Sequence, residues 1–216
     1  MIGERHPWLK SKKNTDRLVF FCDAVFAIAI TILILQIDVP DYINTDNPIE
    51  TVNNLWPAFI SFGISFFVIG RFWVTHLHLF SYIRHLDMRL VVGNFIFMAF
   101  IVFLPFTTAL YSTHSQDLFS LSFYVLSIVA TSVASLFMWR YVLSHKELLH
   151  EDANIKHLDR KAFVGLLIPA EFLIALVIIY IDPRLIDWYW LFFGLIAVGM
   201  ILIARLKWHP EKFSKD

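Results

Sequence analysis

Long apolar runs alternate with short polar segments along the 216-residue chain. Six of these runs are long enough to cross the ~30 Å hydrocarbon layer of a bilayer as helices of about 20 residues. The runs are continuous rather than alternating, which disfavours barrel strands. The pattern therefore predicts an all-α membrane protein with six transmembrane helices per chain, in one domain covering residues 1–216. The predicted spans are residues 18–39, 56–82, 90–110, 118–142, 162–181 and 188–206.

Composition points to the same class of protein. Hydrophobic residues make up 58% of the chain and charged residues 17%, whereas soluble domains average about 45–50% and ~25%. Lys+Arg and Asp+Glu both number 18, so net charge indicates no nucleic-acid partner. The single cysteine, Cys22, excludes an intrachain disulfide and a cysteine-based metal site. We therefore expect the lipid bilayer as a partner, and neither a metal nor another cofactor.

The basic residues are distributed asymmetrically between the loops. In the six-span arrangement every Lys and Arg except Arg184 falls on one side. The positive-inside rule then predicts a multi-pass protein with both termini in the cytoplasm. The first outer loop instead carries acidic residues, beginning with Asp38. These acids could concentrate cations at a pore mouth, or they could be ordinary solvated loop residues.

One carboxylate, Asp23, lies more than a turn inside the first span. Burying an unpaired charge there is costly, so Asp23 is expected to belong to a functional or structural network. Its nearest basic neighbour, Arg17, is six residues away and cannot form a regular i, i+4 pair. The second span supplies further candidates in Trp73 and His76, at a similar depth. We predict a polar network of these four side chains that joins the first two helices.

A stripe of apolar residues continues above Asp23 on one face of the first helix. Ile28, Ile32 and Leu35 recur at helical spacing, with Thr31 beside them and Asp38 beyond them. Such a stripe is often only a packing surface within a bundle. If it lined a pore, rings of aliphatic side chains would close the pore by dewetting, and a threonine ring could partly replace the hydration shell of an ion.

The first span also carries a recognisable motif. Arg17-x-x-x-Phe21-x-Asp23, followed by Ala-Val-Phe-Ala-Ile-Ala-Ile-Thr, resembles the first-helix signature of the transmembrane protein 175 family of potassium-permeable channels. The Phe-Trp-x-x-His run at residues 72–76 resembles that family's second-helix motif. The family pattern has Ser where this chain has Cys22. A thiol is a weaker hydrogen-bonding group than a hydroxyl, so this departure leaves open which contact the side chain makes.

The resemblance implies a single-repeat, prokaryotic type of channel located in the inner (plasma) membrane. It implies a homotetramer whose first helices line a central pore, with K⁺ as the permeant ion and weak to moderate selectivity. By the family pattern, the pore constrictions would be Ile28, Ile32 and Leu35, and the selectivity residue would be Thr31. Asp38, which continues the same helix face, would then lie at the pore mouth. The family's interhelical polar network would correspond to Arg17, Cys22, Asp23, Trp73 and His76.

The same residues also allow two other functions to be compared with a channel. A proton-coupled or other secondary transporter could use Asp23, His76 and Glu171, an acid within the fifth predicted span, as relay groups. An intramembrane enzyme is disfavoured, because no nucleophile and base pair or metal-ligand triad occurs at helical spacing. Asn94 in the third span is predicted to hydrogen-bond between helices. We therefore predict a channel, not an enzyme.

Overall fold

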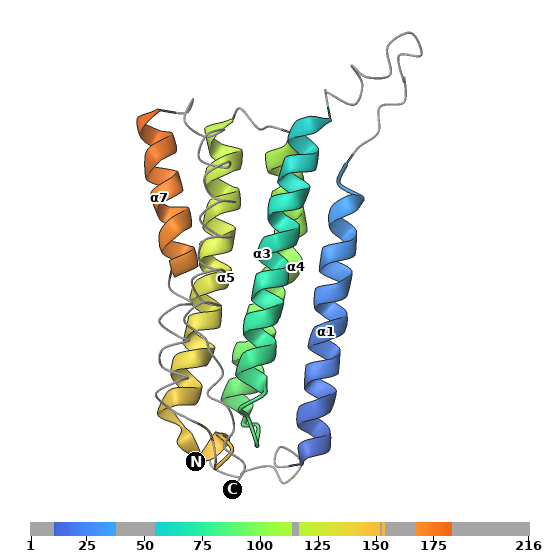
Figure 1. The fold of residues 1–216 in the computed structure, drawn as a ribbon, viewed down its shortest axis with the longest axis vertical. Helices are drawn as coiled ribbons and strands as arrows, with labels where there is room; N and C mark the ends of the chain where they lie inside the picture. The colour runs from blue at the N-terminus through green and yellow to red at the C-terminus, as the bar shows by residue number, and fades with distance from the viewer. Residues whose placement is uncertain (1–10, 38–54, 114–116, 152, 154–166, 183–216) are drawn as a thin grey trace, which may run out of the picture. The chain divides into compact units, whose positions relative to one another are not determined.

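The computed structural model describes residues 11–37, 55–113, 117–151, 153 and 167–182. These residues form helices with one isolated β-bridge, between Ile83 and Leu149. The chain divides into two compact units, Met1–Phe172 and Leu173–Asp216. The helices are α1 (Lys12–Ile34), α3 (Trp56–Phe80), α4 (Met88–Thr113), α5 (Leu118–Ser144), the 3-10 turn η2 (Lys146–Leu148) and α7 (Leu167–Ile181) (Figure 1).

The prediction of six transmembrane helices is wrong for this structure. Within the described residues, four helices are long and apolar enough to cross a membrane, namely α1, α3, α4 and α5. The fifth predicted span, 162–181, corresponds to α7, which has 15 residues. At 1.5 Å per residue the described helix is about 22 Å long, against ~30 Å for the hydrocarbon layer, and residues 162–166 of the predicted span lie outside the described residues. The sixth predicted span, 188–206, lies outside the described residues.

The four long helices pack side by side within the first unit (Figure 1). Helix α1 contacts both α3 and α4, and α4 also contacts α5. The covered face of α1 is formed by Cys22, Phe26, Ala29 and Leu33, all buried. Their spacing of four, three and four residues places them on one side of the helix. The all-α membrane character predicted from the sequence is therefore confirmed.

Polar residues define several helix ends. Pro57 lies in the first turn of α3, where its missing N–H leaves no hydrogen bond unmade. The carboxylate of Asp117 accepts hydrogen bonds from the backbone N–H and the hydroxyl of Ser120, and so caps α5. Asp87 does the same for α4 by accepting from the N–H of Leu90 at 2.8 Å. Helix α1 begins at Lys12, earlier than hydropathy predicted, because a helix can continue beyond the apolar layer.

Buried hydroxyl groups link α3, α4 and α5. The Ser65 hydroxyl lies 2.8 Å from both the Thr108 hydroxyl and the Tyr124 hydroxyl. Thr107 and Ser127 form a second pair at 3.0 Å. In an apolar layer such groups need partners within the protein. These contacts hold α4 and α5 together and leave α1 attached mainly to α3 and α4.

Candidate pore helix and its polar anchor

Asp23 and Trp73 meet where α1 crosses α3. The indole N–H of Trp73 donates to Oδ1 of Asp23 at 2.9 Å. Trp73 is 38% exposed in the single chain and Asp23 is half-buried. An intramembrane carboxylate is stabilised when a donor on a neighbouring helix reaches it. The contact therefore fixes both the height and the rotation of α1 against α3.

A second hydrogen-bonded group lies on the buried side of the same helix turn. The side-chain amide of Asn94 on α4 donates to Sγ of Cys22 at 3.1 Å. Its carbonyl oxygen lies 2.9 Å from Nε2 of His76 on α3. One amide thus joins three helices through both of its polar ends. Cys22 does take part in a polar contact between helices, as predicted, and its partner is Asn94.

His76 is held by aromatic rings as well as by Asn94. The imidazole stacks on Phe80 with ring centroids 4.3 Å apart, and it lies nearly parallel to Phe97. It is 2% exposed, and within the described residues its Nδ1 atom has no hydrogen-bond partner. A ring packed in this way fits the space between α1, α3 and α4. The structure therefore pairs His76 with Asn94 and places the Asp23–Trp73 contact separately.

Arg17 does not join this anchor in the single chain. It is exposed, and no ion pair to Asp23 is found among the described residues. On an ideal helix, six residues correspond to a rotation of about 600°, so Arg17 and Asp23 project in different directions. We refer below to Cys22, Asp23, Trp73, His76 and Asn94 as the polar anchor.

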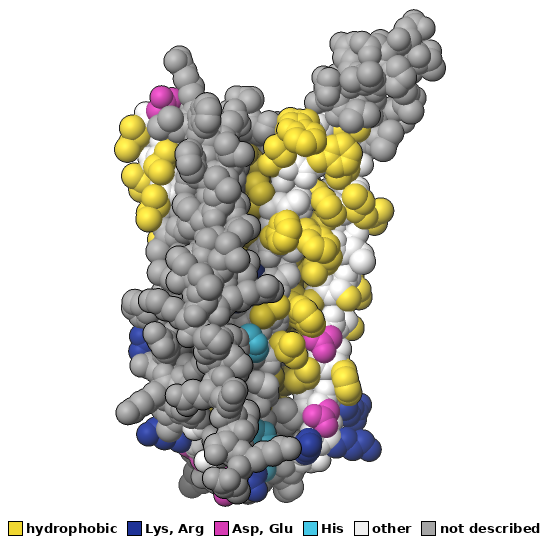
Figure 2. Space-filling model, viewed as in Figure 1, with side chains coloured by type: hydrophobic (Ala, Val, Ile, Leu, Met, Phe, Trp, Pro, Cys, Tyr) yellow, Lys and Arg dark blue, Asp and Glu magenta, His cyan; other side chains and the backbone are white. Residues whose placement is uncertain are grey.

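The opposite face of α1 is left uncovered by the other described helices. Ile28 is 58% exposed, Ile32 37% and Leu35 77%. Thr31 is also exposed, and its hydroxyl donates to the backbone carbonyl of Ile28 at 2.9 Å. Figure 2 shows hydrophobic side chains over the upper part of α1 and basic side chains gathered at its lower end. The sequence-predicted stripe is therefore on the surface of the subunit.

Two predicted residues cannot be placed in this arrangement. Asp38, predicted at the pore mouth, lies outside the described residues. Glu171 lies in α7, and its side chain is outside what the structure describes.

Over the described part of the chain, no group of three or more His, Cys, Asp or Glu side chains is positioned to hold a metal ion. The polar anchor is instead a set of pairwise hydrogen bonds between helices.

Comparison with known proteins shows a family that this arrangement resembles. The family model described as "Endosomal/lysosomal potassium channel TMEM175" matches residues 17–105. A solved structure of a TMEM175 homologue from Chamaesiphon minutus superposes with a TM-score of 0.73 at 26% identity, covering 85% of this chain and 98% of that one. This chain is therefore similar to the TMEM175 family in both sequence and fold. The matched range begins at the predicted motif residue Arg17 and contains the whole polar anchor.

Curated relatives extend the TMEM175 match beyond this range. A protein of Chamaesiphon minutus named as a potassium channel is 29% identical over 198 residues, which cover 89% of this chain and 95% of that protein. A second, from Streptomyces collinus and also named as a potassium channel, is 32% identical over 130 residues, covering 58% of this chain and 63% of that protein. The resemblance to this family that the sequence motif predicted is thus confirmed.

Proposed function

We propose that this chain is a potassium-permeable cation channel in which α1 from several identical subunits lines the pore. The observation that carries the proposal is the two-sided character of α1. One face is anchored to α3 and α4 through the polar anchor, while the face with Ile28, Ile32 and Leu35 is uncovered. Its relatives in Chamaesiphon minutus and Streptomyces collinus are named potassium channels. Several copies of α1 arranged around a symmetry axis, with this face inward, would enclose an ion path.

The chemistry of the exposed face accounts for a gate and for limited selectivity. Rings of Ile28, Ile32 and Leu35 would exclude water from the path and so oppose ion passage until the helices separate. The Thr31 hydroxyl donates to the backbone, so its oxygen can still accept or coordinate. A single hydroxyl ring replaces only part of an ion's hydration shell. Weak to moderate preference for K⁺ over Na⁺ follows.

The proposed assembly is a homotetramer, since a single copy of α1 cannot surround a path and closed cyclic symmetry supplies the others. We place the protein in the plasma (inner) membrane with both termini in the cytoplasm, because the basic residues lie on one side of the predicted spans. Reporter fusions to the N-terminus and within residues 38–54, predicted to lie outside, would test this orientation. Reporter activity on the same side of the membrane for both would contradict it.

Ion flux measured in liposomes tests the pore assignment. We expect Ile28→Asn to increase resting K⁺ flux, because a polar ring keeps water in the constriction. Ile34→Asn is the matched control, since Ile34 is also exposed, at 50%, yet lies about 100° away from Leu35 around the helix. The same vesicles should pass less Na⁺ than K⁺, and little of a bulky organic cation.

The flux of Ile28→Asn, compared with that of Ile34→Asn and of a second stripe variant, Leu35→Ala, decides the proposal. Increased flux for Ile28→Asn with unchanged flux for Ile34→Asn supports a pore lined by this stripe. Unchanged flux for both Ile28→Asn and Leu35→Ala would mean that the stripe does not face the ions. Saturable flux that depends on a proton gradient would instead indicate a transporter.

A further inference from the structure

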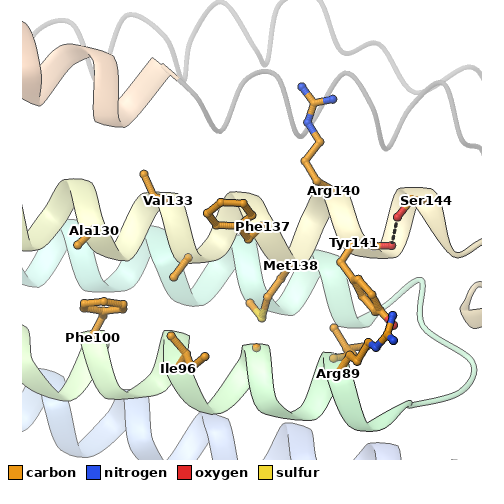
Figure 3. Close-up of a pocket in the computed structure, with 13 residues that line it drawn as sticks. Arg89, Ile96, Phe100, Ala130, Val133, Phe137, Met138, Arg140, Tyr141 and Ser144 are labelled. Atoms are coloured by element: carbon orange, nitrogen blue, oxygen red, sulfur yellow. Dashed lines mark hydrogen bonds between the residues drawn. The ribbon is translucent and has the colours of Figure 1, made fainter. Parts of the chain in front are cut away.

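A long groove runs between α4 and α5, away from the α1 face. Its cavity volume is about 890 Å³, within the range of ~300–1,000 Å³ typical of small-molecule sites. Its walls are apolar, with Ile96 and Phe100 on α4 and Val133 and Phe137 on α5 (Figure 3). Gly93 forms part of the floor, so the absence of a side chain there helps to keep the groove open.

One end of the groove is basic and polar. Arg89, Tyr141 and Ser144 line this end, and Arg140 extends outward from it (Figure 3). Both arginines are exposed, and no ion pair to either is found among the described residues. The nearby carboxylate of Asp87 already accepts hydrogen bonds from the N–H of Leu90 and the hydroxyl of Tyr141. Two positive charges therefore lie at the end of an otherwise apolar groove.

The length of the groove matches one leaflet of a bilayer. Arg89 and Phe100 mark its two ends on α4, and at ~1.5 Å per residue they are separated by about 16 Å along the helix. This is half of the ~30 Å hydrocarbon thickness. With the arginines at the level of the headgroups, the apolar walls would reach the middle of the membrane. Long Arg side chains commonly extend to this interface while their stems stay on apolar surface.

We propose that this groove binds an anionic phospholipid of the leaflet at the arginine-bearing end of the helices. An acyl chain would lie between α4 and α5, with Gly93 beneath it, and the phosphate would sit between Arg89 and Arg140. Basic pockets between transmembrane helices are suited to anionic headgroups. The charge favours a lipid over an apolar helix from a second copy, because the helix would leave both arginines unpaired. The site is separate from the proposed pore and does not depend on it.

Native mass spectrometry of the purified full-length oligomer, titrated with phosphatidylglycerol or phosphatidylcholine, tests the proposal. We expect wild type to retain more phosphatidylglycerol. Arg89→Gln and Arg140→Gln should each weaken its binding about fivefold, the equivalent of ~1 kcal/mol per basic residue. Lys146→Gln is the matched control, because Lys146 is exposed just beyond α5 and does not line the groove. This variant should bind as wild type does.

A second variant tests the apolar half of the site. Gly93→Leu should reduce binding of both lipids, because the new side chain would occupy the groove. A Cβ at Gly93 would meet Met138 at an ordinary 3.6 Å, so the backbone need not move. Soluble glycerol phosphate should not bind at the lipid concentration. The proposal is overturned by equal binding of the two lipids to wild type, by undiminished binding to Gly93→Leu, or by equally strong binding of glycerol phosphate. Equal losses in Lys146→Gln and Arg140→Gln would also overturn it.

Discussion

Asn94 joins more helices than any other single residue of the polar anchor. Its amide donates to Cys22 on α1 and its carbonyl faces His76 on α3. It is completely buried in α4. In a bilayer the apolar surfaces of helices gain little by leaving lipid, so polar contacts of this kind contribute to the choice of neighbours. The thiol of Cys22 fills the acceptor role for this amide, despite being weaker than a hydroxyl.

Replacing Asn94 should therefore loosen the contact between all three helices. Asn94→Leu keeps a similar side-chain size but leaves Nε2 of His76 and Sγ of Cys22 without their partner. We expect a loss of about 1–3 kcal/mol of stability, measured by thermal unfolding in detergent. Cys22→Ser provides the control, because its hydroxyl can still accept from Asn94 and should not lower the unfolding temperature. Wild-type stability in Asn94→Leu would contradict the bridging role.

The Trp73–Asp23 contact gives a second prediction at this scale. Trp73→Phe keeps an aromatic ring but removes the N–H that reaches Asp23. The expected loss of stability is about 1–2 kcal/mol, as for hydrogen bonds between membrane helices. Trp56→Phe should have little effect, because Trp56 is 62% exposed at the start of α3. An equal decrease in unfolding temperature for both variants would assign the effect to the ring rather than the N–H.

At the scale of elements, α1 and the α4–α5 pair differ in how they are held. Helix α1 buries one narrow stripe and exposes the rest, whereas α5 is buried on much of its circumference. Buried hydroxyl contacts and the Asp87–Tyr141 hydrogen bond connect α4 to its neighbours. Helix α1 is the element with the most uncovered surface among the four long helices. Such an element is suited to contact other subunits or to move.

Asp87 makes two hydrogen bonds that should stabilise the α4–α5 pair. Its carboxylate caps α4 by accepting a hydrogen bond from the N–H of Leu90, and it also accepts one from the hydroxyl of Tyr141 on α5. We expect Asp87→Ala to lower the stability by about 1–3 kcal/mol, since both bonds are lost. Tyr141→Phe removes only the contact between helices and should cost less. Thermal unfolding of the two variants measures the difference, and a larger effect for Tyr141→Phe would rule out the capping contribution.

At the scale of the whole molecule, the uncovered α1 face could line an ion path only together with other copies of the chain. A single chain with this stripe facing lipid would be stable in a membrane, but it would not enclose an ion path. Neighbouring copies of α1 around an axis would bring equivalent residues close together. The proposed pore is thus a property of the assembly and not of one subunit.

Cysteine cross-linking tests that assembly directly. In a Cys22→Ser background, which removes the single native thiol, Ile32→Cys should form oxidised dimers in membranes, because equivalent α1 residues would meet at the axis. Leu126→Cys is the control, as Leu126 is 50% exposed on α5 and would be far from the axis. Gel analysis after mild oxidation measures the outcome. Dimers formed by Leu126→Cys but not by Ile32→Cys would place α5 rather than α1 at the interface.

The sequence by itself determined the membrane class, the four long helices and the family motif. Continuous apolar runs exclude most other structures, since backbone groups in lipid must be satisfied within the helix. The same reasoning identified Asp23 and Asn94 as residues needing partners, because polar groups are costly in the apolar layer. Its prediction of six spans is wrong for the described residues, in which four helices are long and apolar enough to cross a membrane.

Only the tertiary structure decided which polar groups meet. The rotation of α1 directs Asp23 toward Trp73 and Cys22 toward Asn94, and leaves Arg17 exposed. Residues on three helices, 72 positions apart in the case of Cys22 and Asn94, come together only when the helices have packed. The same packing left Ile28 and its stripe uncovered and opened the groove at Gly93. Local sequence determines helices, whereas their contacts depend on side-chain fit across the whole bundle.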